Sequence, residues 1–194
     1  FIERLKTTRF NDISIKEVCE SVDVSEGTFF NYFPQKVDVV FYFKQIITLK
    51  LSYEFRTNAE TMGFQKLIER IFDSVADEMD QPYVFYEMIS LFTAERKKPL
   101  NIDLTPVEKF YAFPDYDGIE EIPVQSLEEI FLPLIEEALA KGEIKKGLKS
   151  KDILLTLMAI LLGIPLAVDI EDFGRIKKHF HSQLSLFWQT IGVH

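Results

Sequence analysis

The chain has 194 residues, of which 47% are hydrophobic and 27% are charged, and its formal net charge is −9. These proportions exclude a disordered or fibrous chain and leave room for a large core, in one long domain or two small ones. A lone cysteine, Cys19, excludes an internal disulfide, and we find no charged-then-apolar leader, so we expect a cytoplasmic protein. The longest uncharged apolar run, residues 153–168, is shorter than the roughly 20 residues that span a bilayer. We therefore predict a buried helix there and no membrane anchor.

The chain opens with FIERLKTTRF, which is typical of the last two turns of a longer helix, so we expect further residues before Phe1. A short helix follows. Ser14 and Glu17 stand three apart, as in a capping box, where each side chain satisfies a free backbone amide of the other residue. Apolar residues then recur at helical spacing, which predicts one apolar face made by Ile15, Val18, Cys19 and Val22.

A turn and a second helix come next. Asp23 stands where the chain must turn, and aspartate tolerates left-handed backbone geometry. Ser25 is a suitable N-cap, and Pro34 ends the helix. Phe29 and Phe33 are expected to point back to the core. Two short helices joined by a tight turn form a helix-turn-helix by pattern.

The segment VSEGTFFNYFPQK, residues 24–36, resembles the recognition-helix signature of the TetR family of transcriptional regulators. The resemblance covers about the first quarter of the chain. It implies an all-α fold, with an N-terminal three-helix helix-turn-helix module and a C-terminal helical domain for ligand binding and dimerisation. The family usually has Gly where Asp23 stands and Tyr where Phe30 stands. The second difference removes a hydroxyl that is expected to contact a phosphate.

Helical hairpins also occur as plain packing units in all-α cores, but the polar residues of this segment favour DNA binding because a core does not need them. In a docked module the second helix lies in the major groove. We therefore expect the residues nearest the bases to be Ser25, Glu26, Gly27 and Thr28. Phosphate contacts are expected from Asn31, Tyr32 and Lys36. Glu26 either accepts a hydrogen bond from a cytosine amino group or is simply solvated.

The negative charge belongs to the second part of the chain. Residues 1–50 hold 7 Lys or Arg and 7 Asp or Glu, so the remaining 15 basic and 24 acidic residues carry the whole −9. Affinity for DNA must then come from a few well-placed contacts, from helix N-termini and from two copies of the module.

The remaining elements are helices by their apolar spacing. We place a DNA-binding domain at residues 1–46 and a helical ligand-binding and dimerisation domain at residues 47–194. The expected helices cover residues 35–57, 64–80, 82–92, 126–142, 150–168 and 174–191. Residues 97–125 hold four of the eight prolines, which predicts a long loop with one short helix at 107–113.

The two C-terminal helices are predicted to pair with their symmetry mates in a four-helix dimer interface. A helix that is apolar all round must be covered on more than one side, and a helix-turn-helix usually reads two half-sites. The alternative is a central core helix. The expected interface residues are Leu157, Leu161, Phe180, Leu184, Phe187 and Trp188.

Aromatic residues are abundant between positions 64 and 113, and most of them are expected to pack in the core. The family resemblance and the neighbouring loop favour a pocket between helices for a small, mainly apolar effector. Its expected lining includes Phe72, Tyr86, Glu87, Phe92, Tyr111 and Met158. Glu87 there either receives a cationic ligand or faces water.

We expect no enzyme, cofactor or metal site. His179 and His181 are two apart, on different faces of a helix, and the chain has neither a glycine-rich phosphate loop nor a nucleophile elbow. The sequence thus favours a ligand-responsive repressor that binds a pseudo-palindromic operator in double-stranded DNA as a homodimer. The alternative is a dimeric small-molecule-binding or protein-interaction module that no longer binds DNA, which a heparin or DNA column would distinguish.

Overall fold

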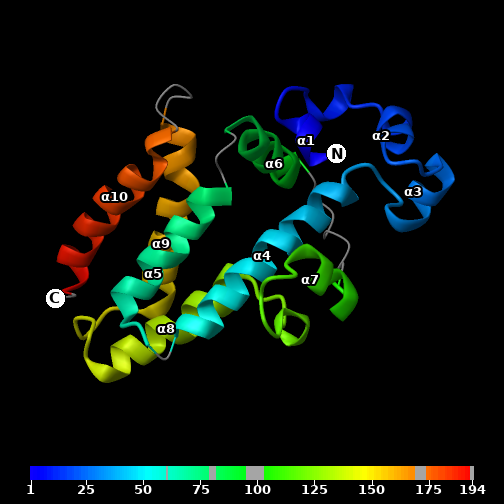
Figure 1. Ribbon diagram of the computed structural model, residues 1–194. Coiled ribbons are helices and arrows are strands. Elements are labelled where there is room, and N and C mark those ends of the chain that lie inside the picture. The colour runs from blue at the N-terminus through cyan, green and yellow to red at the C-terminus, as the bar shows by residue number, and fades with distance from the viewer. Residues whose placement is uncertain (60, 79–81, 95–102, 169–173, 193–194) are drawn as a thin grey trace.

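The computed structural model is all-α, as the sequence predicts. It describes residues 1–59, 61–78, 82–94, 103–168 and 174–192, and for residues 82, 83 and 92–94 it describes the backbone alone. Over these residues it contains ten α-helices and two short 3₁₀ helices, and no strand (Figure 1). The helices are α1 (Ile2–Leu5), η1 (Phe10–Asp12), α2 (Ile15–Ser21), α3 (Glu26–Tyr32), α4 (Asp38–Asn58), α5 (Phe64–Glu78), α6 (Pro82–Ala94), α7 (Pro106–Ala112), η2 (Ile119–Glu121), α8 (Leu127–Lys141), α9 (Ser150–Ala167) and α10 (Ile176–Ile191).

Local signals set the helix ends. The side chains of Ser14, Ser25 and Ser126 each accept a hydrogen bond from the backbone amide three residues on, so each satisfies one of the amides left free at a helix start. Gly142 ends α8 in the left-handed region at φ 76°, where a side chain would be strained. Ser150 is the first residue of α9, and Lys149 precedes it at the cap position without a side-chain hydrogen bond.

The long helix α4 joins the N-terminal module, which comprises α1, η1, α2 and α3, to the rest of the molecule (Figure 1). Its first turns place Val40 and Phe41 in the core of the module, while Leu51 lies in the main core. The division expected after residue 46 therefore falls inside a continuous helix.

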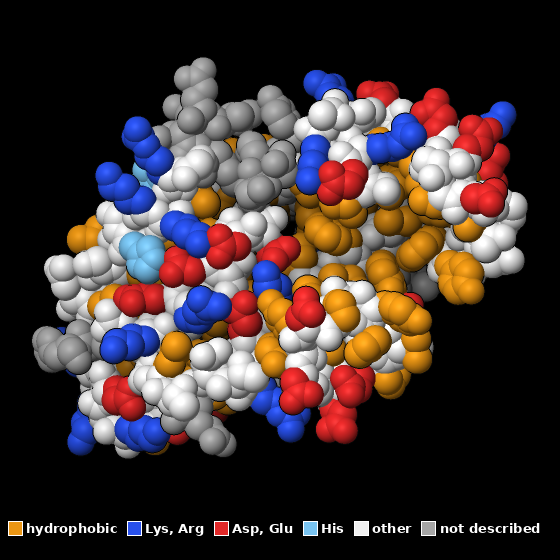
Figure 2. Space-filling view, in the orientation of Figure 1, with side chains coloured by type: hydrophobic (Ala, Val, Ile, Leu, Met, Phe, Trp, Pro, Cys, Tyr) orange, Lys and Arg blue, Asp and Glu red, His pale blue; other side chains and the backbone are white. Residues whose placement is uncertain are grey.

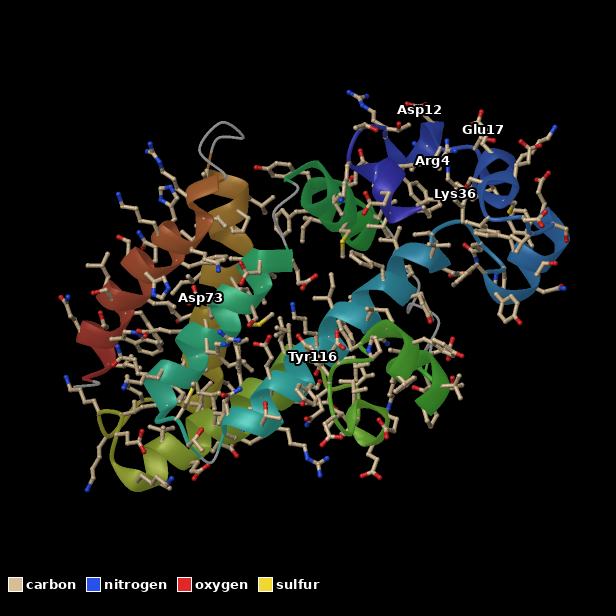
Figure 3. All side chains as sticks on the ribbon, in the orientation of Figure 1. Arg4, Asp12, Glu17, Lys36, Asp73 and Tyr116 are labelled. Carbon is tan, nitrogen blue, oxygen red and sulfur yellow. The ribbon has the colours of Figure 1, made fainter. Side chains whose placement is uncertain are left out.

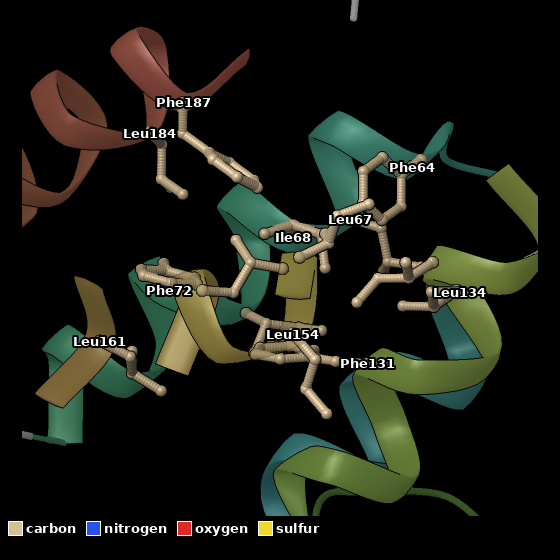
Figure 4. Packing of buried hydrophobic residues seen from close by; sticks show 14 of the residues in the cluster. Phe64, Leu67, Ile68, Phe72, Phe131, Leu134, Leu154, Leu161, Leu184 and Phe187 are labelled. Atoms are coloured by element: carbon tan, nitrogen blue, oxygen red, sulfur yellow. The ribbon is translucent and has the colours of Figure 1, made fainter. Parts of the chain in front are cut away.

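The main core lies between α5, α8, α9 and α10. Phe72 is fully buried, with the ring of Phe131 stacked at 6.3 Å and that of Phe180 edge-on at 5.2 Å. Figure 4 shows Leu184 and Phe187 of α10 pointing toward α5. Burial of each such side chain stabilises the fold by about 1.5–3 kcal/mol.

A smaller core holds the N-terminal module against α6. It contains Leu5, Phe10 and Ile13 from the first segment and Val84 from α6, all buried. The Glu87 carboxylate of α6 also accepts a hydrogen bond from the backbone amide of Phe10. The helix α6 is thus part of the module's packing although it lies about half the chain away in sequence.

Residues 103–126 form a compact segment on α4, with α7 as the short helix that the sequence predicts. Ile119 and Ile122 pack around Leu49 of α4 in a core of their own. The Tyr42 hydroxyl of α4 donates a hydrogen bond to Glu108 at 3.2 Å. This part of the expected loop is therefore folded.

The helix α9 is the one described helix that is long and apolar enough to cross a membrane, judged by length and composition alone. In the structure one side of it, with Ile153, Leu157 and Leu161, packs into the main core.

Candidate nucleic-acid interface and ligand cavity

The helices α2 and α3 form a hairpin around a left-handed residue. Asp23 has φ 54°, the geometry expected for the turn, and it is the only described residue other than glycine with a positive φ. The backbone amide of Val24 donates a hydrogen bond to the carbonyl of Cys19 at 3.0 Å, which closes the turn. The backbone angle of Asp23 and this hydrogen bond together set the direction of α3 relative to α2.

Aromatic rings attach α3 to the rest of the molecule. Phe29 is buried and its ring lies 5.4 Å from that of Phe33, which in turn lies 5.6 Å from the ring of Tyr42 in α4. Phe29 therefore points inward, as the sequence predicts, and Phe33 is half-buried. The opposite side of α3 is left free of packing.

Six of the seven residues predicted to contact DNA are exposed: Ser25, Glu26, Gly27, Thr28, Asn31 and Tyr32. Tyr32 is 76% exposed, and Phe30 beside it is 43% exposed. The hydroxyls of Ser25 and Thr28 lie 2.9 Å apart and form a hydrogen-bonded pair at the start of the helix. The first turn of α3 thus presents free backbone amides together with small polar side chains.

Gly27 has no packing reason to be glycine. A Cβ added there would meet only the Ser25 Oγ within 4 Å, at 3.7 Å, an ordinary contact. Glycine inside a helix costs about 0.5–1 kcal/mol relative to alanine. The residue leaves the outer surface of α3 open to close approach.

Lys36, the seventh predicted residue, is placed differently. Its ammonium group donates a hydrogen bond to the carbonyl of Asn11 at 3.3 Å and lies 4.7 Å from the centre of the Phe10 ring. Burial lowers the pKa of Lys36, although the nearby charge of Asp12 acts in the opposite direction (Figure 3). The side chain therefore ties the start of α4 to η1 and does not lie on the exposed side of α3.

Most cations of the module are paired within it. Arg4 binds Glu17 at 2.9 Å, Lys6 binds Glu3 at 2.9 Å, and Lys16 lies 3.9 Å from Glu20. The Glu17 carboxylate thus accepts from Arg4. It does not form the second bond of the predicted capping box, in which it would accept from the backbone amide of Ser14. Acidic and basic side chains alternate over this part of the surface (Figure 2). Because these cations are paired with carboxylates and the charges of the module balance, its described residues present no broad basic face.

Arg9 is a further cation near this surface, and it is absent from the residues that the sequence predicts to contact DNA. It is exposed and has no ion-pair partner among the residues that the structure describes. It stands directly before η1, in the segment that packs against α6. Because an isolated arginine forms no sequence pattern, nothing in the sequence marks Arg9 as a functional residue.

A cavity of about 420 Å³ lies between α4, α5, α6, α8 and α9. Its charged and polar lining residues are Lys44, Thr48, Glu78, Ser126 and Glu128. The rest of its lining is apolar and comprises Phe43, Ile47, Leu51, Val75, Val84, Phe85, Met88, Ile89, Leu127, Met158, Leu161 and Leu162. The size lies within the usual range for small-molecule sites, roughly 300–1,000 Å³.

Of the six residues predicted to line a ligand pocket, Met158 alone is among the lining residues. Phe72 is in the main core, and Tyr111 is 77% exposed on α7. The Tyr86 hydroxyl donates to the carbonyl of Pro165 at 2.9 Å, and Glu87 faces Phe10. The side chain of Phe92 lies outside the described residues. Most of the other lining residues are apolar side chains of α4, α5, α6, α8 and α9.

The six residues predicted at a dimer interface are all buried in the chain's own core: Leu157, Leu161, Phe180, Leu184, Phe187 and Trp188. Trp188 also donates its indole N–H to Glu69 of α5 at 2.8 Å. These side chains cover α5 and offer no surface to a second copy. The exposed apolar residues of the helix pair are instead Leu155, Leu162, Leu166 and Leu186.

Comparison of the chain with protein-family models, with curated proteins and with solved structures finds no match.

Proposed function

We propose that this chain is a DNA-binding transcriptional regulator that reads duplex DNA with α3. The observation that carries the proposal is the α2–Asp23–α3 hairpin, in which the inner side of α3 is fixed by aromatic packing and the outer side is polar and exposed. Helices presented in this way dock in the major groove of DNA. The resemblance of residues 24–36 to the TetR signature supports the same function.

In this proposal Ser25, Gly27 and Thr28 lie nearest the bases, and the open side of Gly27 allows DNA to approach the helix backbone. Asn31 and Tyr32 reach phosphates, which fix the register of the module but do not read sequence. Arg9 adds a further phosphate contact. The anionic Glu26 makes the module selective, because it is compatible with a cytosine amino group and repelled by phosphate.

The proposed reader is a homodimer. Leu155, Leu162 and Leu166 recur at spacings of seven and four along α9, which places them on one face, and Leu186 is exposed on the adjacent α10. Pairing of this face with its symmetry mate removes these leucines from water. Two modules held in this way read half-sites about 34–36 Å apart.

We further propose that a ligand in the cavity changes DNA affinity through α6. Val84 and Met88 both line the cavity and pack on the core of the N-terminal module. A ligand that displaces Val84 and Met88 therefore acts directly on the N-terminal module. The protein represses transcription when the two modules of the dimer are held in register with the two half-sites of the DNA. Such coupling between two sites is typically about 1–3 kcal/mol.

The test is a binding-site selection from a random duplex library, followed by titration of the selected duplex by fluorescence anisotropy. We expect a pseudo-palindromic duplex whose affinity falls steeply with rising salt. Gly27→Ala is the decisive variant, because it leaves the fold without a clash and favours helix by about 0.5–1 kcal/mol, yet it blocks close approach to DNA.

Gly63→Ala is the matched control, since a Cβ at Gly63 likewise meets no clash, with nothing within 4 Å, and the residue stands before α5, outside the module. We expect Gly27→Ala to unfold at the same or a higher urea concentration and to lose DNA affinity, and Gly63→Ala to keep that affinity. Equal binding of selected and scrambled duplexes at every salt concentration contradicts the proposal.

A further inference from the structure

We propose that the cavity takes a single-chain amphiphile, with its hydrocarbon chain inside and a hydrogen-bond-donating head, an amine or an alcohol, at the start of α8. The inference names the ligand class of the regulator and rests on the ligand-responsive part of the proposed function.

The walls of the cavity require a hydrocarbon. Thr48 is buried, and its hydroxyl already donates to the carbonyl of Lys44 at 2.8 Å. The Glu78 carboxylate is held by the ammonium of Lys50 at 2.5 Å. Among the described residues, no buried side-chain nitrogen or oxygen lacks a hydrogen-bond partner. A polar group among the apolar walls would therefore lose its water with few partners to replace it.

The size and the side chains of the cavity favour one chain. A volume of about 420 Å³ is near the lower end for ligand sites, so two acyl chains do not fit with their heads. Met88 of α6 and Met158 of α9 both line it. Methionine side chains are flexible and adapt to irregular apolar shapes, which suits an alkyl chain.

The chemistry of the head follows from the start of α8. Ser126 and Glu128 line the cavity and also line a second, shallower hollow with Gln125, Glu129 and Leu132. The charged residues of this second hollow are the carboxylates Glu128 and Glu129. Hydrogen bonds from the backbone and the side chain of Ser126 lower the pKa of Glu129, so it is ionised at neutral pH.

A head at this point therefore meets negative charge. An ammonium or a hydroxyl donates to Glu128, whereas a carboxylate is repelled. Lys44 lines the cavity from α4 and is the residue that could attract an anionic head. It is exposed, as Glu128 is, but unlike the head site at the start of α8 it lies on another helix and already has an interaction partner.

The experiment is calorimetric titration of the unaltered chain, without DNA, with decylamine, 1-decanol and decanoate, each below its micelle concentration. We expect decylamine to bind most tightly and decanoate most weakly. Because Glu128 is exposed, a charge-assisted hydrogen bond to it corresponds to a preference of up to about fivefold for the amine over the alcohol. Butylamine, with the same head and a short chain, should show no measurable binding. Tightest binding by decanoate, or equal binding by butylamine, overturns the proposal.

Three variants locate the two parts of the ligand. Glu128→Gln should remove the preference for decylamine over 1-decanol and leave the affinity for 1-decanol unchanged. Met158→Gln, which places a polar group of similar length in the wall, should weaken all three ligands. Thr48→Val should leave them unchanged, because the proposal gives that hydroxyl no contact with the ligand. Weaker binding by Thr48→Val contradicts a hydrocarbon-only interior.

The outcomes separate this inference from the proposed function. Specific DNA binding without binding of any of the three amphiphiles overturns the ligand class alone. Binding of decylamine in the expected order without specific DNA binding leaves the ligand class intact and overturns the DNA-reading role.

Discussion

The Glu87 carboxylate in α6 accepts a hydrogen bond from the backbone amide of Phe10, at 3.4 Å and across 77 positions of sequence. Phe10 is buried in the core of the N-terminal module, and Met88, the next residue after Glu87, lines the cavity. One turn of α6 thus touches both the module and the cavity. This arrangement gives the proposed coupling a polar contact, beside the apolar contacts of Val84 and Met88, that a single substitution removes.

Glu87→Ala should reduce the coupling between ligand and DNA. The change removes the acceptor of the Phe10 amide but leaves the apolar contacts of α6 in place, so we expect a loss of about 0.5–1.5 kcal/mol in unfolding free energy. The factor by which saturating 1-decanol lowers DNA affinity should move toward one. Glu87→Gln keeps an oxygen acceptor and is the control, since it should behave like the unaltered chain. Equal coupling in all three proteins, measured by anisotropy, contradicts a role for this bond.

Leu155→Asp and Leu186→Asp should each convert a dimer into monomers. These leucines are 69% and 55% exposed in the single chain, so an aspartate there does not disturb the monomer core. In a dimer the same aspartate would be buried without a partner, which is strongly unfavourable. Sedimentation velocity measures the change. Leu148→Asp is the control, because Leu148 is also exposed but lies outside α9 and α10. A monomeric unaltered chain at micromolar concentration rules out this interface.

Substitutions at Asp23 should report on the turn of the hairpin. The residue has φ 54°, a region that costs a residue with a Cβ about 1–2 kcal/mol and costs glycine little. Asp23→Gly should therefore unfold at a higher urea concentration than the unaltered chain, and Asp23→Val at a lower one. Ser21→Gly is a suitable comparison, because it makes a similar change inside α2 and should destabilise. If Asp23→Gly were the less stable protein, the left-handed geometry of this turn would be wrong.

The helix boundaries could be predicted because their causes are local. Ser25 and Ser126 cap helices through the amides of their own next turn, and Gly142 ends one through its own backbone angle. The left-handed backbone angle of Asp23 is likewise a local property of a single residue. Each of these signals lies within four residues of its effect, so the sequence alone contains the information.

The neighbours of each helix face could not be predicted in the same way. The helix α9 is apolar on all sides, so its pattern does not distinguish Leu157, which meets the chain's own core, from Leu155, which meets solvent. The cavity posed a related difficulty. The apolar spacing of α4 and α6 predicts that Phe43 and Met88 face inward, but whether inward-facing side chains touch or leave a space depends on distances between helices that no local pattern records.

Tyr42→Phe should change how stability depends on alkaline pH. Burial, followed by the charge of Glu108 and the hydrogen bond to it, raises the pKa of Tyr42 from 10.0 to about 12. Between about pH 10 and pH 12 the tyrosine ionises in the unfolded chain but not in the folded one, so the folded state binds more protons and loses stability as pH rises.

Tyr42→Phe removes this contribution. At neutral pH it should lower the unfolding free energy by about 0.5–1.5 kcal/mol, because Glu108 loses a hydrogen bond. Above about pH 10 the difference between the two proteins should shrink, since the unaltered chain then pays for keeping Tyr42 protonated. Tyr32→Phe is the control, because that side chain is exposed on α3 and should give a curve parallel to the unaltered chain. Urea unfolding at several pH values measures the differences, and a gap for Tyr42→Phe that widens with rising pH would show that Tyr42 does not hold its proton in the folded state.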